Sequence, residues 1–517
     1  MTRSKKILLT TATILSAAIL ISVIHHYQLK AAVNRYISEL KAKGEPMELA
    51  QVLPSPVPPE QNGAEALREA DALFNALFGA NKSLLATNYV YGMRMVAPGK
   101  AMVRWQQPDI RDIDGTNSWE NVKAAVVQNA KAFALLQQII KTPIFSFPVK
   151  YARGVADLSF TNLYLAQSKS AALRLEAAEL CELNQGDTVS AVKNLRAMLA
   201  IVKAIRDERF EISELVRIAI AQIALTANWE LLQSPNLSDQ QLADLQHDWM
   251  NFDFIASNAN ALAMERVTGR ITTAKWRRSG SELEYYLGTW TRLGLSDQEE
   301  TTLDKLKVKI KVFLWRYWWS YPDEIRQLKS YEMFLETARF AETNYSLQTV
   351  IAKQKKGLAA MKLDKAADEF DGFSDPAKID MHSLLSQDAT SLSAIFDKVM
   401  KVEAAKQMII TAIALKRYQL KHGNYPPDLN SLVLEFLSVV PLDPVDGQPL
   451  RYRSNTDEAF TLYSVGENGV DDGGDPSLEN GVTSSGYYWL NNHALDWVWP
   501  QPATPAEIEY FREHLPK

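Results

Sequence analysis

An uncharged apolar run near the N-terminus limits the possible architectures of this chain more than any other feature. Residues 7–24, ILLTTATILSAAILISVI, carry no charged side chain. At about 1.5 Å per residue, a helix of this length spans roughly 27 Å, close to the hydrocarbon thickness of a bilayer. A cleaved signal peptide has a shorter apolar region, whereas this run continues beyond the small residues 16–18. The sequence therefore favours an uncleaved transmembrane anchor.

The basic residues on either side of this run predict its orientation. Arg3, Lys5 and Lys6 lie directly before it, whereas the basic residues after it are spread over 30–43. Because positive charge close to the membrane favours the cytoplasmic side, residues 1–6 are predicted to form a cytoplasmic tail. The chain is then a single-pass protein of the inner (cytoplasmic) membrane, with its bulk in the periplasm or otherwise extracytoplasmic.

Composition limits the partners and the redox chemistry. The net charge is −5 and the pI is near 5.9, so the chain lacks the basic character of a nucleic-acid-binding protein. The single cysteine, Cys181, excludes an intrachain disulfide, and its place on an apolar helix face predicts a buried thiol. With 517 residues, of which 47% are hydrophobic, the chain is long enough for several globular domains.

The remaining chain reads as mostly helical up to residue 355. Residues 25–63 are predicted to be a juxtamembrane helix followed by a proline-rich spacer that holds the next domain away from the bilayer. Residues 64–355 show helical periodicity with clear boundary signals, such as Gly186 with Asp187 and the capping box Ser238–Gln241. Paired helices of this kind resemble tetratricopeptide-type hairpins, although a strict 34-residue period is not found.

One helical segment is unusually aromatic. Residues 308–328, VKIKVFLWRYWWSYPDEIRQL, contain six aromatic side chains, and Pro322 is expected to end or kink the helix. The segment can be a helix packed into the core, a patch at the membrane interface, or a platform for carbohydrate or peptide.

The C-terminal part predicts a different architecture. Residues 356–390 read as a linker, 391–490 as an α+β module, and 491–517 as a tail. Within the module, 391–422 form a long amphipathic helix that stops at Gly423, and two short strands around Tyr452 and Leu462 form a hairpin. The predicted fold class is therefore mainly α: a transmembrane helix, an all-α helical-hairpin domain, and a module with a long helix and a small antiparallel sheet.

The module also shows a family resemblance. The run ALKRYQLKHGNYPPDLNSLV…PLDPVDGQPLRYR…FTLYSVGENGVDDGG, within about 400–490, resembles the globular part of the major pseudopilin of type II secretion systems. Pseudopilins join their membrane helix directly to this part, whereas here residues 25–390 lie between the two, so filament assembly is not expected. The whole chain also resembles uncharacterised membrane-anchored proteins of planctomycete and verrucomicrobial bacteria.

The acidic, glycine-rich loop after the second strand is the main candidate site. Glycines allow carbonyls to turn inwards, and Asn468, Asp471, Asp472 and Asp475 would repel one another less around a hard cation. The resemblance implies a structural calcium held by the Val465 carbonyl, Asn468 and Asp475, with Asn468 standing where the family usually has Asp. A solvated turn of the same composition is the alternative.

No catalytic motif of the zinc-protease, α/β-hydrolase or P-loop type occurs in the sequence. Three functions stay open. The first is a non-enzymatic envelope protein that binds a protein partner or acts as a scaffold. The second is an accessory component of a type II secretion or pilus-like system. The third is an envelope hydrolase whose site is assembled from residues distant in the sequence.

Overall fold

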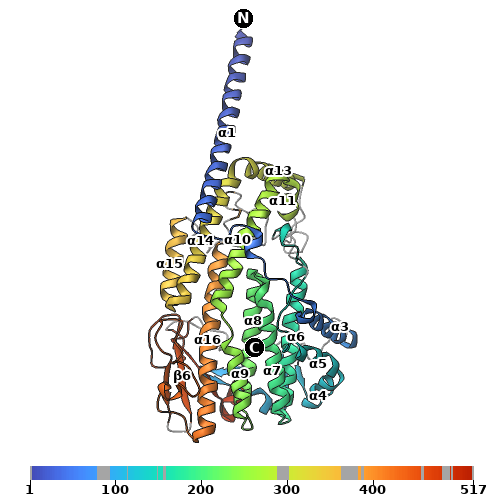
Figure 1. The fold of residues 1–517 in the computed structure, drawn as a ribbon, viewed down its shortest axis with the longest axis vertical. Coiled ribbons are helices and arrows are strands. Elements are labelled where there is room, and N and C mark those ends of the chain that lie inside the picture. Colours follow the sequence, from blue (N-terminus) through green and yellow to red (C-terminus); the bar gives the residue numbers. More distant parts are fainter. Residues whose placement is uncertain are drawn as a thin grey trace.

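The computed structural model is mainly helical, with small β-sheets in the described residues (Figure 1). It describes residues 3–78, 93–112, 115–147, 149–154, 159–287, 302–361, 382, 384–385, 389–455, 459–479, 489–490 and 493–514. The predicted mainly-α class is confirmed, as is a small antiparallel sheet in the C-terminal region. The predicted linker, 356–390, lies mostly outside the described residues.

The N-terminal helix α1 (Arg3–Ala42) is continuous, but its two parts have different surroundings. The first part projects away from the body (Figure 1), and Ile14 and Ile21 are 64% and 67% exposed. The second part packs against α14 (Ser320–Asn344), where Leu40 is fully buried. The apolar run and the juxtamembrane helix are therefore one rigid element attached to the body at its C-terminal end.

Two helices are long and apolar enough to cross a membrane, α1 and α8 (Glu211–Leu232), within the described residues. The most apolar window of α1 is 0% buried, whereas that of α8 is 78% buried in the body. Both helices are long and apolar enough to span a membrane, and they differ in how much of their apolar window is buried.

The proline-rich stretch runs along the body instead of away from it. Its short helices are α2 (Leu49–Val52) and η1 (Pro59–Gln61). Glu45 pairs with the buried Arg266 at 2.8 Å, and Met47 and Val52 are buried. The expectation of a spacer that lifts the next domain is therefore wrong. Proline restricts φ without preventing packing, and the apolar side chains between the prolines supply the contacts.

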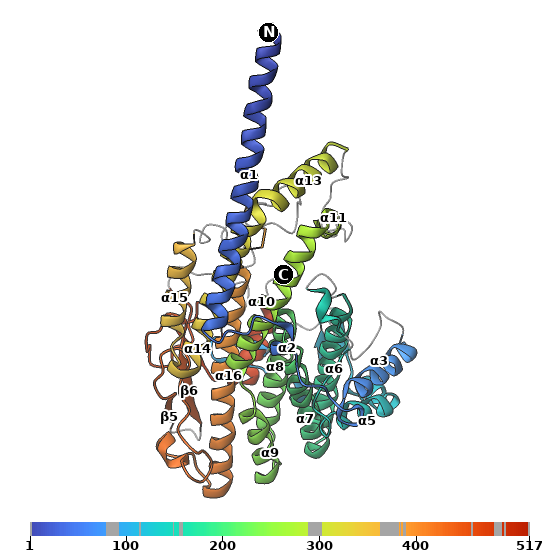
Figure 2. The same ribbon diagram turned by 45° about the horizontal axis from the view of Figure 1, so that its top comes forward.

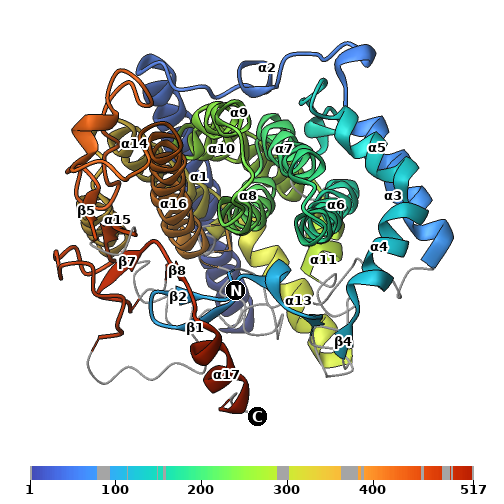
Figure 3. The ribbon, with the colours of Figure 1, turned by 90° about the horizontal axis from the view of Figure 1, so that it is seen from below.

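The body consists mainly of long helices, and Figure 3 shows α6 to α10 side by side. Its helices are α3 (Ala64–Phe78), α4 (Trp119–Gln128), α5 (Ala130–Gln138), α6 (Ser159–Asn184), α7 (Thr188–Ile205), α8, α9 (Asp239–Met250) and α10 (Phe254–Arg278). Short 3-10 turns lie at Arg104–Gln106, Tyr151–Arg153 and Arg206–Glu208.

The predicted helix boundaries in the body are confirmed. Gly186 adopts φ +79° after α6, and the Asp187 carboxylate accepts a hydrogen bond from the Ser190 N–H at 3.0 Å to begin α7. Ser238 and Gln241 form the expected capping box of α9. Cys181 is buried, as predicted, and burial raises the pKa of its thiol to about 11.

The aromatic segment belongs to a continuous helical stretch at the end of the body from which α1 projects (Figure 1). The stretch comprises α13 (Thr302–Leu314), a π-helical turn η6 (Trp315–Trp319) and α14, with α11 (Gly280–Leu287) beside it. Trp315 is fully buried, whereas Phe313, Tyr317 and Trp318 are exposed. The helix does not end at Pro322, because the π-turn directly before it accommodates the irregular hydrogen bonding.

The C-terminal module is built on the long helix α16 (Ala389–His422), which ends before Gly423 at φ +80° as predicted. The helix packs against α8, α9 and α10, and α15 (Leu347–Ala360) also touches it. One hydrophobic core extends from the helical body through α16 into the sheet beside it. Figure 2 shows that sheet lying against α16 and α15. The module is therefore integrated into the body.

The sheet of the module has the order β5-β6-β7, all antiparallel. Its strands are β5 (Arg451–Ser454), β6 (Phe460–Val465) and β7 (Asp496–Val498). The predicted β5–β6 hairpin is confirmed, and residues 456–458 of its connection lie outside the described residues. The third strand belongs to the stretch predicted as a tail, so the predicted module boundary at 490 is too early.

The rest of the predicted tail is also structured. Strand β8 (Gln501–Pro502) pairs in parallel with β2 (Lys100–Ala101), which pairs with β1 (Met95–Ala97). Helix α17 (Pro505–Glu513) follows, with a capping box at Thr504. A further pair, β3 (Ile110–Asp112) with β4 (Gly115–Asn117), lies within the predicted all-helical region. The C-terminal residues thus connect the module to the first part of the body.

Candidate functional site

The predicted acidic loop begins where β6 ends, beside β7 and the helices α15 and α16. Gly469, Gly473 and Gly474 all have positive φ, between 69° and 80°, so the tight turns use the conformation that glycine adopts without strain. The loop is attached to the helices through Glu467. Its carbonyl accepts a hydrogen bond from Gln348 at 2.6 Å, and its carboxylate lies 3.4 Å from the Lys401 Nζ.

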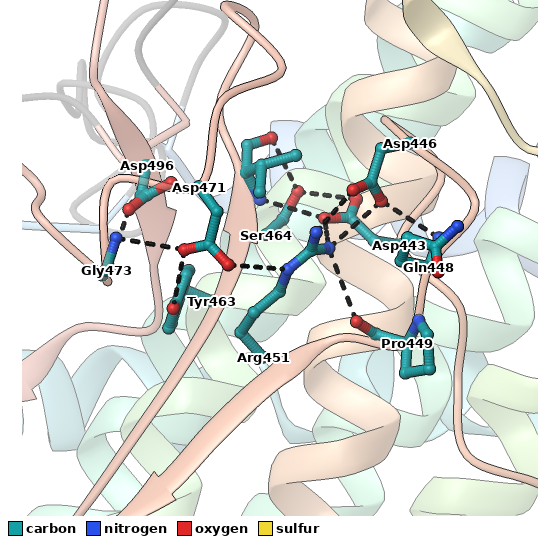
Figure 4. A network of polar contacts seen from close by, with 12 residues as sticks. Asp443, Asp446, Gln448, Pro449, Arg451, Tyr463, Ser464, Asp471, Gly473 and Asp496 are labelled. Atoms are coloured by element: carbon teal, nitrogen blue, oxygen red, sulfur yellow. Dashed lines mark hydrogen bonds and ion pairs between the residues drawn. The ribbon is translucent and has the colours of Figure 1, made fainter.

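Val465, at the first end of the loop, is positioned by a buried aspartate. The Val465 N–H donates to Asp443 Oδ2 at 2.9 Å, and the Ser464 hydroxyl donates to Asp443 Oδ1 at 2.8 Å (Figure 4). Asp443 also accepts the Val445 N–H and a hydrogen bond from Arg451 at 3.2 Å. Burial raises the pKa of Asp443 to about 6, against the effect of these hydrogen bonds.

Asp471 is held by neighbours outside the loop as well as within it. It accepts hydrogen bonds from the Tyr463 hydroxyl at 2.9 Å, the Gly473 N–H at 3.0 Å and the Arg451 Nε at 3.4 Å (Figure 4). Partial burial raises the pKa of Asp471, but these hydrogen bonds and the Arg451 charge outweigh it and lower the pKa overall. Its charge is therefore compensated by a guanidinium.

The other predicted ligands use their side chains locally. Asn468 accepts the Val470 N–H at 2.9 Å and donates to Asp472 Oδ2 at 3.0 Å. Asp475 accepts the Ser477 N–H at 2.9 Å. Such contacts are typical of Asx turns. The loop therefore brings Asn468 and Asp472 together, while Asp471 and Asp475 are engaged elsewhere.

Asp496, at the start of β7, organises the loop, and the sequence prediction missed it. Its carboxylate accepts the N–H groups of Gly474 at 2.7 Å, Asp475 at 3.1 Å and Asp472 at 3.5 Å. Burial raises the pKa of Asp496, and the Asp472 charge adds to this, whereas the backbone hydrogen bonds oppose it. The aromatic run after it, Trp497-Val-Trp, was the strand signal that could have identified it.

The direction of the main-chain N–H groups in the loop is relevant to the predicted cation site. The loop turns several N–H groups inwards onto a carboxylate, which is the arrangement of an anion nest more than of a carbonyl cage. No group of three His, Cys, Asp or Glu side chains that could hold a metal occurs in the described part of the chain. The Asn468 amide nitrogen donates to Asp472, and the Asp472 N–H donates to Asp496 at 3.5 Å, so these three residues lie near one another in the loop.

A cavity of about 250 Å³ lies where the module meets the body. Aromatic and amide side chains and one lysine line it: Gln233, Lys416, Tyr425, Phe460, Trp499 and Gln501. Burial lowers the pKa of Lys416. The hydrolase hypothesis would need two facing carboxylates or a histidine–carboxylate pair, and the lining of this cavity contains neither.

Buried glutamates form a second set of ionisable groups, deep in the helical body. Arg104 pairs with Glu230 at 2.8 Å and with Glu176 at 2.6 Å. Glu179 is fully buried beside them, and burial raises its pKa well above the ordinary value. The same holds for Glu211 at the start of α8, with the Glu265 charge adding to the effect. Because these carboxyls lie inside the core, a soluble substrate does not reach them.

No model of a protein family matches, and neither a curated protein nor a solved structure matches significantly. The resemblance of the module to the major pseudopilin therefore stays a prediction.

Proposed function

We propose that this chain is a single-pass envelope protein whose α1 helix lies in the cytoplasmic membrane and whose body lies outside the cytoplasm. The observation that carries the proposal is that the apolar part of α1, whose most apolar window is 0% buried, projects from the body (Figure 1). An 18-residue apolar surface is costly in water and favourable in hydrocarbon. The orientation rests on the basic cluster before the run.

The anchor is tested by fractionation of cells that express the full chain. We expect it to sediment with membranes and to resist alkaline extraction. Deleting residues 7–24 should move the body into the soluble fraction with an unchanged melting temperature, because this part of α1 contributes little to the core. Full-length chain in the soluble fraction would refute the anchor.

The second part of the proposal is a scaffold role for the body and module. It is supported by the use of the ionisable groups at the candidate site, where Asp443 and Asp496 hold main-chain N–H groups and Asp471 holds Arg451. These are structural tasks that fix a loop on a rigid surface. Affinity purification from detergent-solubilised membranes should recover a stoichiometric envelope protein. Recovery of this chain alone would count against the role.

Two narrower proposals concern the module. The first is a calcium ion in the loop, which is supported by the proximity of Asn468, Asp472 and Asp496. Calcium would stabilise the folded chain by mass action. We expect calcium to raise the melting temperature of the full chain relative to chelator, and Asp472→Asn to reduce this difference more than Asp475→Asn does. Equal melting temperatures with calcium and chelator would remove the ion.

The second narrower proposal is an accessory role in a type II secretion or pilus-like system, which rests on the sequence resemblance alone. The affinity purification that tests the scaffold role also tests this one. Components of such a machine among the recovered proteins would support it, and their absence alongside another stoichiometric partner would refute it.

A further inference from the structure

The outward side of α13 and η6 carries a row of exposed apolar side chains, which we call the outer face of α13. Its members are between 37% and 53% exposed: Leu306, Ile310, Phe313, Tyr317 and Trp318. Leu306, Ile310, Phe313 and Tyr317 follow one another at intervals of four, three and four, so they lie on one side of the helix. Figure 1 shows α13 at the end of the body from which α1 projects.

The outer face is not needed for packing, because the opposite side of the same helix already meets the body. Val312 and Trp315 are buried there against Trp276 and Leu283. The Trp315 indole N–H donates to Asp323 at 3.0 Å, which fixes the rotation of the helix. The sequence therefore provides two apolar stripes: one is buried against the described residues of the body, and the other is exposed.

Lysines border the outer face on both sides. At about 100° per residue, Lys305 and Lys309 lie on one border, and Lys307 and Lys311 lie on the other. Exposed apolar side chains between two rows of basic side chains are typical of helices that lie in the interface of an anionic membrane. The net acidity of the chain makes this local basic strip more distinctive.

The outer face also lies at the level along α1 where a membrane would end. The apolar run of α1 stops at Ile24, and two residues later the His26 Nδ1 lies 3.1 Å from the Tyr317 carbonyl oxygen. The His26 ring also packs edge-on against Tyr321. Tyrosine and tryptophan concentrate at the boundary between hydrocarbon and headgroups. The position along α1 and the residue types thus indicate the same boundary.

We infer that the outer face of α13 lies in the interface of the bilayer that α1 spans, with its lysines among anionic headgroups. This rests on the proposed anchoring by α1 and adds a second membrane contact. A single helix would let the body rotate and tilt, whereas a second contact on the same body, which α14 holds against α1, fixes one side of the body towards the membrane.

The inference is tested with the full chain reconstituted in vesicles of phosphatidylethanolamine and phosphatidylglycerol. Cys181 is buried, so a fluorophore sensitive to its environment can be attached at Phe313→Cys or Ile310→Cys. Val127→Cys is the matched control, because Val127 is 66% exposed on α4, at the other end of the body in Figure 1. Unchanged melting temperatures establish that the labelled variants fold.

We expect the emission at 310 and 313 to shift to shorter wavelength on reconstitution and to be quenched by spin-labelled lipid, with neither effect at 127. Replacing Lys305 and Lys309 by Glu, or omitting phosphatidylglycerol, should reduce the shift. A chain that floats with the vesicles while its probe at 313 stays in water refutes the inference and leaves the anchor intact. Emission that shifts to shorter wavelength without quenching by spin-labelled lipid refutes the inference and indicates that the face is covered by a second protein. A chain that fails to float refutes both.

Discussion

Helices α1 and α8 have similar apolar character, but the fold uses them in opposite ways. Both pass the same test of length and composition for a membrane span, yet the apolar window of α1 is 0% buried and that of α8 is 78% buried. The difference lies in their charged residues. Residues 7–24 of α1 contain none, whereas α8 carries Glu211, Glu214, Arg217 and Glu230.

Burying the charges of α8 is costly, and ion-pair partners offset part of that cost for Glu214, Arg217 and Glu230. Glu230 pairs with Arg104, and Glu214 pairs with Arg217 at 2.8 Å within the helix. Arg217 also lies over the Phe254 ring, with its guanidinium carbon 4.4 Å from the ring centroid. A helix with these charged residues is stable in a protein core that supplies their partners, whereas a helix without charged residues can lie in lipid. Matched substitutions in the two helices test this difference.

The largest effect is expected from one acidic substitution made in each helix. Ile220→Asp would place a carboxylate without a designed partner at a fully buried position of α8, at a cost of several kcal/mol, about 4 or more, and loss of the folded body. Ile14→Asp should leave the melting temperature of the body unchanged while weakening membrane insertion by about 3 kcal/mol. Circular dichroism and membrane fractionation measure the two effects. Equal destabilisation of the body by both changes would contradict the comparison.

A smaller effect is expected when a buried charge of α8 loses its partner. Arg104→Met removes the guanidinium that bonds Glu230 and Glu176, and breaking a buried ion pair costs about 3–5 kcal/mol. Burial already raises the pKa of Glu230 against the effect of Arg104, so the variant should lose further stability as pH rises. Urea unfolding at several pH values measures this.

The control for that variant is Arg68→Met, which removes an exposed ion pair with Glu65 three residues away and should change stability little. A loss for Arg104→Met as small as that for Arg68→Met would show that Glu230 does not depend on its partner.

The smallest effect is expected at Glu211, the first residue of α8. Burial raises its pKa above the ordinary 4.5, and the Glu265 and Glu214 charges add to this. The native state therefore binds the proton more tightly than the unfolded chain does. The contribution to stability is complete below the unfolded pKa and is lost as pH rises towards the folded pKa. Glu211→Gln should stabilise the chain by on the order of 1 kcal/mol at pH 8 relative to pH 4.

Chemical unfolding of the Glu211→Gln variant at the two pH values checks this sign. Glu60→Gln, at an exposed position, is the control that should follow the wild-type pH profile. If the stability of the wild type and that of the Glu211→Gln variant rose by the same amount between pH 4 and pH 8, the expected direction would be contradicted.

Local signals in the sequence predicted the elements better than their assembly. Gly186, Asp187, Ser238 and Gly423 mark helix ends through their own backbone and side-chain chemistry, so those ends could be predicted from neighbouring residues. The β5–β6 hairpin likewise depends on a short stretch of sequence. By contrast, no local pattern shows that 44–63 packs on α10 or that β8 pairs with β2.

The same limit applies to the candidate site. The loop residues 466–475 could be identified from composition, but the partners that hold them could not. Arg451 comes from the neighbouring strand, and Asp496 is separated from the loop by about twenty residues, in a segment predicted as a tail. Acidic residues close in sequence predict mutual repulsion, whereas the fold directs Asp471 towards Arg451 and surrounds Asp496 with main-chain N–H groups.

The proposed functions all require α1 to cross the cytoplasmic membrane with the body on its outer side. This topology is tested most directly by adding protease to spheroplasts and to intact cells of a Gram-negative host that produces the full chain, with detection by an antibody against the body. We expect the chain to be degraded in spheroplasts, to be protected in intact cells, and to sediment with membranes before digestion. A chain that survives intact in spheroplasts until detergent is added would place the body in the cytoplasm and contradict the account.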